Sequence, residues 1–249
     1  MTNSKTGSPR RLGIIGADGR MGQAVEARAC AGDAPTFVVA QRVSLEQPDA
    51  SGLAECDVVI DFSAGAALVD ALPHLADGTA LVSGTTGLDA VQDAAVEQAA
   101  ARLPILRSGN FSLGIAVLCA LAERAAGMLG DGWDVEVLEM HHRHKVDAPS
   151  GTALMLGEAV AQGCGVSLAE KAAHDRVGAR RDGDIGFAVL RGGGVYGVHE
   201  VRIASESEMI TLGHQALNRD VFADGALAAA DWLIGRPPGL YTMADLLGD

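Results

Sequence analysis

Five consecutive residues at positions 141–145 can each carry a positive charge, although the whole chain has a formal net charge of −13. The five are His141, His142, Arg143, His144 and Lys145. Because like charges repel one another, folding alone gives little reason to gather them. A histidine titrates near neutral pH and can deliver a proton, and cations beside it hold an anion. The cluster therefore predicts a site where Lys145 attracts a carboxylate and His141 or His142 donates a proton.

A Pro-Ser-Gly-Thr sequence follows the cluster at 149–152 and is typical of a helix start. Ser150 is the candidate N-cap of a helix from about Gly151 to Ala161. The first amide groups of such a helix, those of Gly151 and Thr152, are donors suited to a carboxylate. The helix start therefore predicts a second anion-binding element beside the cluster.

Two other interpretations of the cluster stay open. A run of charges is often a solvated loop, although apolar segments flank this one. The His-x-His pattern is also common among metal ligands, and Glu139 would be a further ligand. Arg143 and Lys145 would stand in the middle of such a site and repel a cation, so we expect no metal here.

The segments around the cluster predict an α+β unit that positions it. An apolar helix at 113–129 and a strand at 133–140 precede the cluster. Two later β-rich runs, at 198–205 and 208–216, should pair antiparallel within a mixed, open sheet that has its own core. A final helix at 220–234 is rich in small residues, and we expect it to return to the first half of the chain.

The first half opens with an apolar strand at 11–15 that runs into a GxxGxxG motif at 16–22, and a helical pattern follows. Strand, glycine turn and helix are the context in which backbone amides approach a pyrophosphate. The commoner spacing is GxGxxG, and a plain tight turn is the alternative. The candidate cofactor-binding residues of this motif are Gly16, Ala17, Asp18, Gly19, Arg20 and Met21.

Apolar β-rich runs recur in this half at 36–40, 57–63, 80–87 and 104–112, with helical stretches between them. This alternation predicts an α/β fold with a Rossmann-like, doubly wound parallel sheet. Ligands of such sheets lie beyond the carboxyl ends of the strands, so the loops there should face the cofactor. Those loops contain Gly84, Thr85, Thr86, Gly109, Asn110, Phe111 and Ser112.

Gln41 and Arg42 stand where a NAD-selective protein carries an acidic residue for the ribose 2′-hydroxyl, about 20 residues after the glycines. Without the acid a 2′-phosphate is not repelled, and the Arg42 guanidinium can pair with it. We therefore expect NADPH to be used at least as well as NADH. An exposed Arg42 without this role is the alternative.

Composition limits the class of protein. A chain of 249 residues suffices for one large or two modest domains. It has no apolar stretch long enough to cross a bilayer, and residues 1–11 form a polar leader without a signal core. The four cysteines lack metal-type spacing, so we expect reduced thiols and a cytoplasmic protein. The acidic charge balance argues against nucleic acid as a partner.

Together these motifs resemble the 4-hydroxy-tetrahydrodipicolinate (dihydrodipicolinate) reductase family of the bacterial diaminopimelate and lysine pathway. The resemblance runs from about residue 11 to the C-terminal GLYTMADLL and is carried by GADGRMG, DFS, GTTG, GNFSLG, HHRHKVDAPSGTA, RGGGVYGVHEV and NRDVFADGALAAA. It implies an oxidoreductase that reduces a cyclic dicarboxylate imine with NADPH or NADH. Hydride passes to the ring carbon that loses its hydroxyl, and a proton completes the product.

The resemblance also implies a role for each residue of the histidine motif. His141 is the proton donor, and Lys145 assists it and binds substrate. His142 and the amides of Gly151 and Thr152 hold the substrate carboxylates.

By the same resemblance the chain forms two domains and a homotetramer. Residues 1–112 and 219–249 bind the dinucleotide, and residues 113–218 bind substrate and form the tetramer through their sheet. We expect the domains to close over the substrate about hinges near 112 and 219. Four residues depart from the family pattern without touching the acid–base motif, so activity should survive: Gln41, Gly65, Gly109 and Ala116.

Two alternatives to the reductase are weighed. One is an amino-acid dehydrogenase of similar architecture, for which the chain offers no motif of its own. The other is a non-catalytic NAD(P)-sensing protein, which would have no use for a proton donor at His141 or for Lys145.

Overall fold

The computed structural model describes residues 8–31, 36–130, 132–175 and 177–248. Most of the predicted polar leader, residues 1–7, lies outside them. The chain divides into two compact units, one of residues 1–112 with 220–249 and one of residues 113–219. We call them unit 1 and unit 2. The roles predicted for these two parts of the chain stay predictions.

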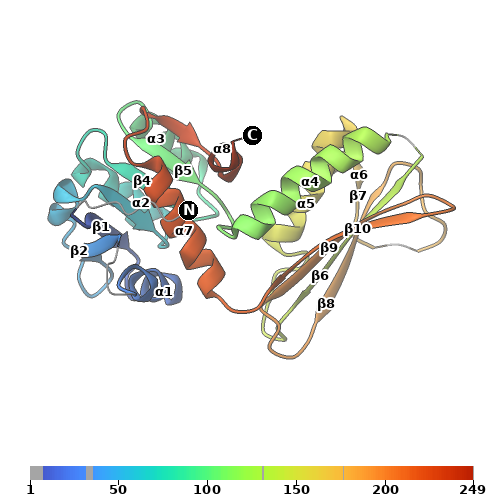
Figure 1. Ribbon diagram of the computed structural model, residues 1–249, viewed down its shortest axis with the longest axis horizontal. Coiled ribbons are helices and arrows are strands. Elements are labelled where there is room, and N and C mark those ends of the chain that lie inside the picture. The colour runs from blue at the N-terminus through green and yellow to red at the C-terminus, as the bar shows by residue number, and fades with distance from the viewer. Residues whose placement is uncertain (1–7, 32–35, 131, 176, 249) are drawn as a thin grey trace. The chain divides into compact units, whose positions relative to one another are not determined.

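Unit 1 is built on six parallel strands in the order β11-β5-β4-β3-β1-β2 (Figure 1). Strands β3 and β4 are buried along their whole length and apolar up to their last residues, Asp61 and Ser83. This sheet confirms the predicted parallel α/β architecture. The strands are β1 (Arg10–Ile15), β2 (Phe37–Val43), β3 (Val58–Asp61), β4 (Ala80–Ser83), β5 (Pro104–Arg107) and β11 (Gly239–Tyr241).

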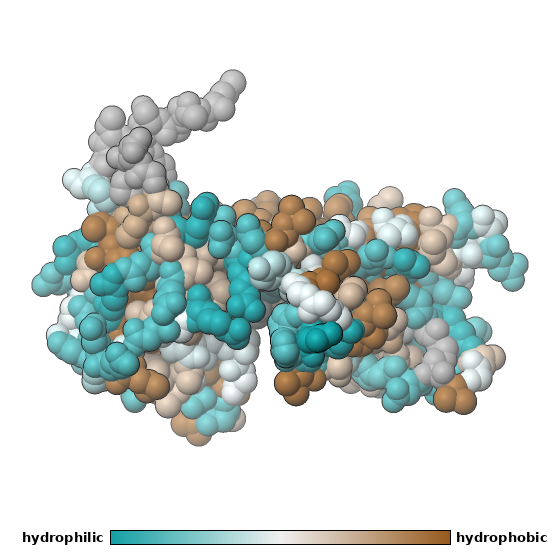
Figure 2. All heavy atoms as spheres, turned by 90° about the horizontal axis from the view of Figure 1, so that it is seen from below, coloured by the Kyte–Doolittle hydropathy of each residue, from teal (hydrophilic) through white to brown (hydrophobic). Residues whose placement is uncertain are grey.

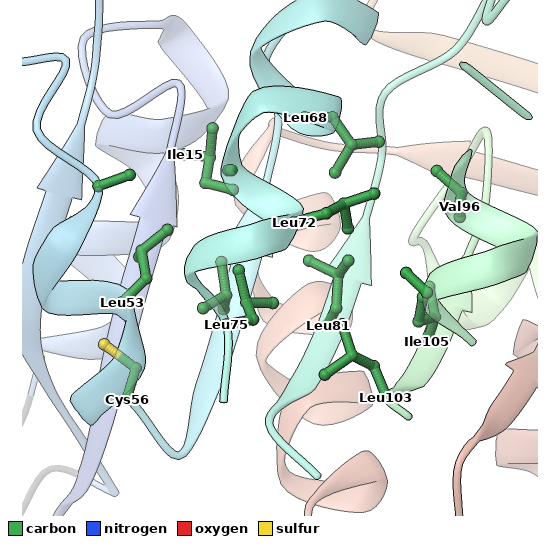
Figure 3. Close-up of a cluster of buried hydrophobic side chains, with 14 of the residues drawn as sticks. Ile15, Leu53, Cys56, Leu68, Leu72, Leu75, Leu81, Val96, Leu103 and Ile105 are labelled. Carbon is green, nitrogen blue, oxygen red and sulfur yellow. The ribbon is translucent and has the colours of Figure 1, made fainter. Parts of the chain in front are cut away.

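Helices pack on this sheet and enclose its core. Helix α7 contacts α1 and strands β3, β4 and β5 through a buried face made mostly of alanine and glycine, so the final helix does return to the first half of the chain. Figure 3 shows the apolar cluster on which α2 and α3 pack, with Leu72 and Leu81 in it. The helices are α1 (Arg20–Ala29), η1 (Ser51–Glu55), α2 (Gly65–Ala71), η2 (Leu72–His74), α3 (Ala90–Ala99), α7 (Asp220–Leu233) and α8 (Met243–Leu247).

Unit 2 is built on a mixed sheet in the order β10-β9-β6-β8-β7. Strand β9 runs antiparallel to both β10 and β6, whereas β8 runs parallel to β6 and β7. Both the predicted mixed sheet and the antiparallel pair of late strands are confirmed. The elements are α4 (Leu113–Leu129), β6 (Asp134–His141), α5 (Gly151–Cys164), α6 (Leu168–Lys171), β7 (Ala172–Ala173), β8 (Ile185–Arg191), β9 (Gly197–Ala204) and β10 (Met209–Ala216).

The buried face of this sheet changes from apolar to polar along its length. Burial alternates strictly along β6 and β9, so every second side chain faces the helices α4 and α5. At one end Val137 faces Val201 across the two strands. One step further along the same face, Glu139 lies opposite His199. The sheet thus carries a hydrophobic core at one end and a buried polar cluster at the other.

The described part of the chain has no helix that is both long and apolar enough to span a bilayer. On the face drawn in Figure 2, hydrophobic residues lie scattered among hydrophilic ones. Single exposed apolar side chains of this kind are ordinary on protein surfaces.

Candidate active site

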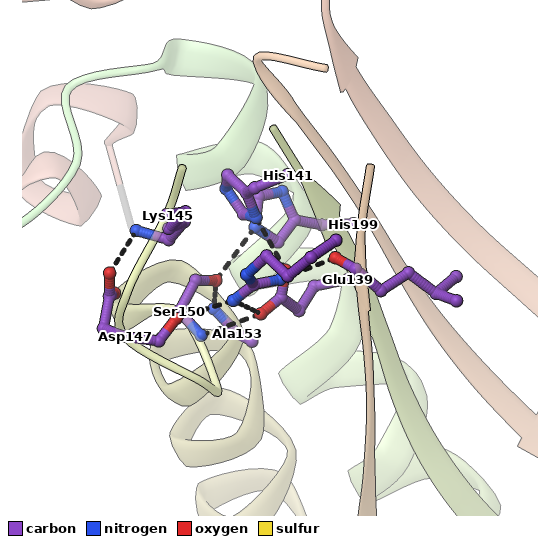
Figure 4. A network of polar contacts seen from close by, with 9 residues as sticks. Glu139, His141, Lys145, Asp147, Ser150, Ala153 and His199 are labelled. Atoms are coloured by element: carbon purple, nitrogen blue, oxygen red, sulfur yellow. Dashed lines mark hydrogen bonds and ion pairs between the residues drawn. The ribbon is translucent and has the colours of Figure 1, made fainter. Parts of the chain in front are cut away.

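His141 is the last residue of β6, and its imidazole is bonded to Glu139, two residues earlier on the same strand. The Nδ1 atom of His141 lies 2.6 Å from Oε2 of Glu139. Strand alternation turns both side chains inward, and they are 10% and 1% exposed, respectively. Figure 4 shows this pair within a network of polar contacts. Because the Glu139 carboxylate is hydrogen-bonded to Nδ1, the other ring nitrogen, Nε2, is the one left to face a ligand.

Arg191, the last residue of β8, holds Glu139 with two parallel hydrogen bonds. Its Nη1 lies 2.7 Å from Oε2 and its Nη2 2.8 Å from Oε1. The backbone N–H of Ser150 also donates to Oε1, at 3.0 Å. Burial by itself raises the pKa of Glu139, but hydrogen bonds from Arg191, His141 and Ser150 outweigh it and hold that pKa below its usual value. Glu139 is therefore a buried carboxylate that stays ionised at neutral pH.

Two residues of β9 complete the surroundings of the His141 ring. His199 meets it edge-on, with ring centroids 5.0 Å apart, and its own Nε2 lies 3.3 Å from Ser150 Oγ. Burial lowers the pKa of His199 to about 4, so this ring is neutral at pH 7. At Gly197 a Cβ atom would lie only 3.2 Å from Nε2 of His141, so the missing side chain leaves the imidazole its space.

The loop after His141 holds the other members of the charged cluster. Lys145 forms an ion pair with Asp147, 2.8 Å from Nζ to Oδ1, and is 22% exposed. The Nδ1 atom of His142 is buried, and no described residue bonds to it, so a ligand or a water molecule would satisfy it. Arg143 and His144 are exposed. The solvated-loop interpretation therefore fits these last two residues and fails for His141.

Ser150 is the N-cap of α5, because its Oγ accepts the backbone N–H of Ala153 at 3.1 Å. This confirms the predicted start of the helix. The helix runs to Cys164, three residues beyond the predicted end, and stops at a left-handed Gly165. Gly151 is exposed, with nothing within 4 Å of where a Cβ would stand, so the space at the helix start is open.

The described residues hold no group of three or more His, Cys, Asp or Glu that could bind a metal ion. Glu139, the further ligand of the metal interpretation, is already bonded to Arg191 and His141. The guanidinium of Arg191 would also repel a cation at this position.

In unit 1, the turn between β1 and α1 depends on its glycines. Gly16 has a φ of +79°, and a Cβ there would lie 2.4 Å from the carbonyl oxygen of Phe62. A Cβ at Gly22 would lie 2.3 Å from the carbonyl oxygen of Gly16. Gly19 is the N-cap residue of α1, and no side chain caps that helix start. The first amides of α1 are thus available to a phosphate.

A hollow of about 290 Å³ lies beside this turn, at the carboxyl ends of β3 and β4. A Cβ at Gly84 would lie 2.2 Å from Cε1 of Phe62, so this wall of the hollow requires glycine. Phe62 in turn meets Phe111 edge-on, with ring centroids 5.5 Å apart. The residues that line the hollow are Gly19, Arg20, Met21, Phe62, Ser63, Gly84, Thr85 and Thr86. A glycine-walled hollow beside an uncapped helix start fits a nicotinamide dinucleotide.

The other predicted cofactor residues do not line this hollow. They are Gly16, Ala17, Asp18, Gln41, Arg42, Gly109, Asn110, Phe111 and Ser112. Gln41 donates to the carbonyl oxygen of Asp49 at 2.7 Å, and Arg42 Nε lies 2.9 Å from a carboxylate oxygen of Glu26. The guanidinium expected to meet a 2′-phosphate therefore already has an anionic partner on α1.

Asp61, fully buried at the end of β3, organises the loops that line the hollow. Its Oδ1 accepts hydrogen bonds from Ser63 Oγ at 2.5 Å and Ser63 N at 3.1 Å, and its Oδ2 accepts one from Ser83 Oγ at 2.7 Å. The Ser63 amide also donates to Thr85 Oγ1 at 3.2 Å. Burial raises the pKa of Asp61, although the hydrogen bonds from Ser63, Ser83 and Thr85 act against that shift.

Comparison with known families agrees with both halves of this description. A model described as "Dihydrodipicolinate reductase, N-terminus" matches residues 10–111, and one described as "Dihydrodipicolinate reductase, C-terminus" matches residues 114–247. The chain belongs to the dihydrodipicolinate reductase family. The resemblance seen in its motifs is thereby confirmed.

Relatives of this family share much of the sequence. The 4-hydroxy-tetrahydrodipicolinate reductase of Caulobacter vibrioides is 47% identical over 255 residues, covering 96% of this chain and 98% of its own. That of Zymomonas mobilis is 47% identical over 249 residues, covering 96% and 97%. A solved dipicolinate-bound dihydrodipicolinate reductase from Paenisporosarcina sp. TG-14 aligns with a TM-score of 0.72 and 23% identity, covering 94% of this chain and 97% of that one. At that identity the likeness shows a shared fold.

Sequence reasoning missed five residues that shape the two sites. It treated Glu139 only as a conceivable metal ligand and gave no role to Asp61, Phe62, Arg191 or His199. One signal was available for Glu139. Its position in an alternating strand places it on the same face as Val135, Val137 and His141, where an unpaired acid would be costly.

Proposed function

We propose that the protein reduces 4-hydroxy-tetrahydrodipicolinate to tetrahydrodipicolinate with NAD(P)H, in the diaminopimelate and lysine pathway. One NAD(P)H and one proton are consumed, and NAD(P)⁺ and water leave with the product, so atoms and charges balance. The observation that carries the proposal is the buried Glu139–His141 pair beside Lys145 in a chain of this family. This pair supplies a shielded proton donor next to a cation that attracts a carboxylate.

The bound nicotinamide supplies the hydride. The protein's part is to hold the dinucleotide at the start of α1 and along the loops after β3, β4 and β5. The hollow is lined by Gly84, Thr85 and Thr86, among others. Phe111 packs edge-on against Phe62, another lining residue. We assign Gly16 to Met21 and Gly109 to Ser112 to the same ligand, because the first segment includes three lining residues and Phe111 of the second contacts the lining residue Phe62.

In unit 2, His141 donates the proton and Lys145 draws one substrate carboxylate toward it. The open start of α5, with the amides of Gly151 and Thr152, suits the second carboxylate. The buried, unpaired Nδ1 of His142 supports its assignment to the same substrate. A dicarboxylate thus meets cationic or N–H donors at each end.

NADPH is expected to serve at least as well as NADH. Gln41 offers no negative charge to repel a 2′-phosphate, and Arg42 offers a cation. The pairing of Arg42 with Glu26 tempers this expectation, because the phosphate has to compete with a carboxylate that is already bound. We therefore expect a modest preference for NADPH over NADH.

Assembly as a homotetramer through the sheet of unit 2 is also proposed. Strands β8 and β10 expose large apolar side chains, among them Leu190, Met209 and Ile210. Sedimentation equilibrium would report the mass of the assembly. All four cysteines are free, which suits the reducing cytoplasm we expect as its location.

The function is tested by forming the substrate in place from pyruvate and aspartate semialdehyde with the preceding synthase. Oxidation of NADPH or NADH that depends on the synthase is the expected result. His141→Gln should lower kcat about 10²- to 10⁴-fold and keep dinucleotide binding. His144→Gln, which changes an exposed neighbour, is the matched control. A folded protein that binds nucleotide but oxidises neither cofactor would instead be a sensor or a different dehydrogenase.

A further inference from the structure

Glu139 is held so firmly that it can orient another group. Its carboxylate receives two hydrogen bonds from Arg191 and one from the Ser150 amide, in addition to its contact with His141. These partners come from three different segments of unit 2, namely β8, the cap of α5 and β6 itself. Because each oxygen of the carboxylate has two hydrogen-bond partners, the carboxylate cannot rotate without breaking several hydrogen bonds at once.

The contact with Glu139 decides where the protons of His141 reside. An ionised carboxylate only accepts hydrogen bonds, so the Nδ1 atom of His141, 2.6 Å away, must carry the hydrogen. The Nε2 atom lies on the other side of the ring and has no partner among the described residues. A neutral His141 is then protonated on Nδ1, and a charged His141 has one mobile proton, on Nε2.

We propose that Glu139 is a positioning residue that holds the Nδ1–H of His141, so that Nε2 is the atom that gives its proton to the substrate. In that step the Nε2–H bond breaks and a bond from this hydrogen to the substrate forms. The imidazole becomes neutral and keeps its Nδ1–H on Glu139. The proposal deepens the proposed function and rests on it for the identity of the proton acceptor.

Glu139 also keeps His141 able to be charged in surroundings that oppose it. Burial lowers the pKa of His141, and the charges of Lys145 and Arg191 act in the same direction. The neighbouring His199 is neutral at pH 7. Among the described charged groups that act on the ring, namely Glu139, Lys145 and Arg191, only Glu139 is anionic. Its hydrogen bond and its charge raise the pKa of His141. Without the carboxylate the imidazolium would lose its main stabilising partner.

Glu139→Gln tests the proposal through the pH profile of kcat. Activity falls as pH rises through the pKa of the acid, and a lower pKa moves this decline to lower pH. We expect the decline to shift to lower pH and kcat at neutral pH to fall about 100-fold, with KM for the cofactor unchanged. Glu139→Asp keeps the charge and should recover at least part of both effects. A merely structural loss would lower activity without moving the decline.

The matched control is Glu136→Gln on the same strand. Glu136 faces the other side of the sheet and pairs with Arg180, so its loss removes a carboxylate outside the His141 network. We expect the pH profile of this variant to match the unchanged protein. A decline that stays in place in folded Glu139→Gln, or that moves equally in Glu136→Gln, would overturn the proposal.

A second measurement needs neither a variant nor the proposed substrate. Nitrogen-15 chemical shifts of the histidines at high pH report which ring nitrogen carries hydrogen, and His141→Gln identifies the signal. The expected result is the Nδ1–H form for His141, and its conversion to the Nε2–H form in Glu139→Gln. An Nε2–H form in the unchanged protein refutes the proposal even if the variants do not fold. Because no turnover is involved, this result is separate from failure of the reductase assay.

Discussion

Unit 1 and unit 2 each bury a carboxylate near the carboxyl end of a central strand. The pKa values of these two carboxylates are shifted in opposite directions. Asp61 in β3 is bonded to hydroxyl groups and an amide, and burial raises its pKa. Glu139 in β6 is equally buried, but it meets a guanidinium and an imidazole, and its pKa is lowered. At Glu139 the hydrogen bonds, two of them from a guanidinium, outweigh the effect of burial on the pKa, whereas at Asp61 the hydrogen bonds from uncharged groups do not.

This difference matches the roles proposed for the two sites. The site in unit 1 is proposed to bind its ligand with backbone amides and glycine turns, and Asp61 holds Ser63 and Ser83 in place there by hydrogen bonds. The site in unit 2 is proposed to move a proton, and Glu139 supplies a negative charge beside which His141 can gain and lose one. Uncharged partners suit a fixed loop geometry, and charged partners suit acid–base chemistry.

Removing the positive charge of Arg191 should have the largest effect on stability. Arg191→Gln leaves Glu139 ionised and buried with its main partner gone, which costs about 3–5 kcal/mol of unfolding free energy. Urea denaturation measures the loss. Arg202→Gln, which breaks an ion pair with Glu200 on the same sheet, should cost about 1 kcal/mol or less. Equal losses in both variants would mean that Glu139 does not depend on Arg191.

The corresponding change in unit 1 should be milder. In Asp61→Asn the hydroxyls of Ser63 and Ser83 can rotate to donate or accept, so we expect a loss of about 1 kcal/mol of unfolding free energy. Dinucleotide affinity should also fall, because Ser63 and Thr85 line the hollow. The exposed Asp70→Asn on α2 is the control for both measurements. A loss as large as that of Arg191→Gln would contradict the distinction between uncharged and charged partners.

The dependence of stability on pH sharpens the comparison further, because the two carboxylates act with opposite sign. Glu139 has a pKa below its ordinary 4.5, so its contribution is present above that value and is lost as pH falls through the lowered pKa. Asp61 has a pKa above its ordinary 3.8, so its contribution is present below that value and is lost as pH rises through the raised pKa.

Unfolding free energies between about pH 3 and pH 8 measure both effects. Glu139→Gln should lose stability relative to the unchanged protein as pH rises from the acid end. Asp61→Asn should gain stability relative to it over the same rise. Parallel curves for the two variants would show that the partners do not set the sign.

Much of the fold follows from periodic patterns that the sequence displays. Alternating apolar strands and helices predict the parallel sheet, and the glycine spacing predicts the turn where Gly16 has its positive φ. The end of α5 was predicted too early, at Ala161. Glycine normally weakens a helix, but a Cβ at Gly163 would lie 2.1 Å from the carbonyl oxygen of Glu123 in α4. Close packing of the two helices therefore favours glycine inside the helix.

The candidate site was predictable only in its local part. His141, Lys145 and the Ser150 cap stand within ten residues of one another and form a motif. Arg191 reaches Glu139 from 52 residues away, through the parallel pairing of β6 and β8. Nothing in the sequence gives the register of these strands, so the partners of Glu139 become visible only in the folded sheet.

The smallest effect is expected at Gln41 and Arg42 in unit 1, which are proposed to select the cofactor and where the Arg42 guanidinium is exposed. Gln41→Glu places an acid beside the expected 2′-phosphate and should shift the NADPH-to-NADH ratio of kcat/KM about 5-fold toward NADH, as about 1 kcal/mol would give. Glu26→Gln releases Arg42 from its present partner and should shift the ratio the other way. Kinetics with both cofactors at low and high salt measure the two shifts, and salt should reduce each. If neither variant moves the ratio, Gln41 and Arg42 do not bind the phosphate, and selectivity resides in the residues that line the hollow, Arg20 among them.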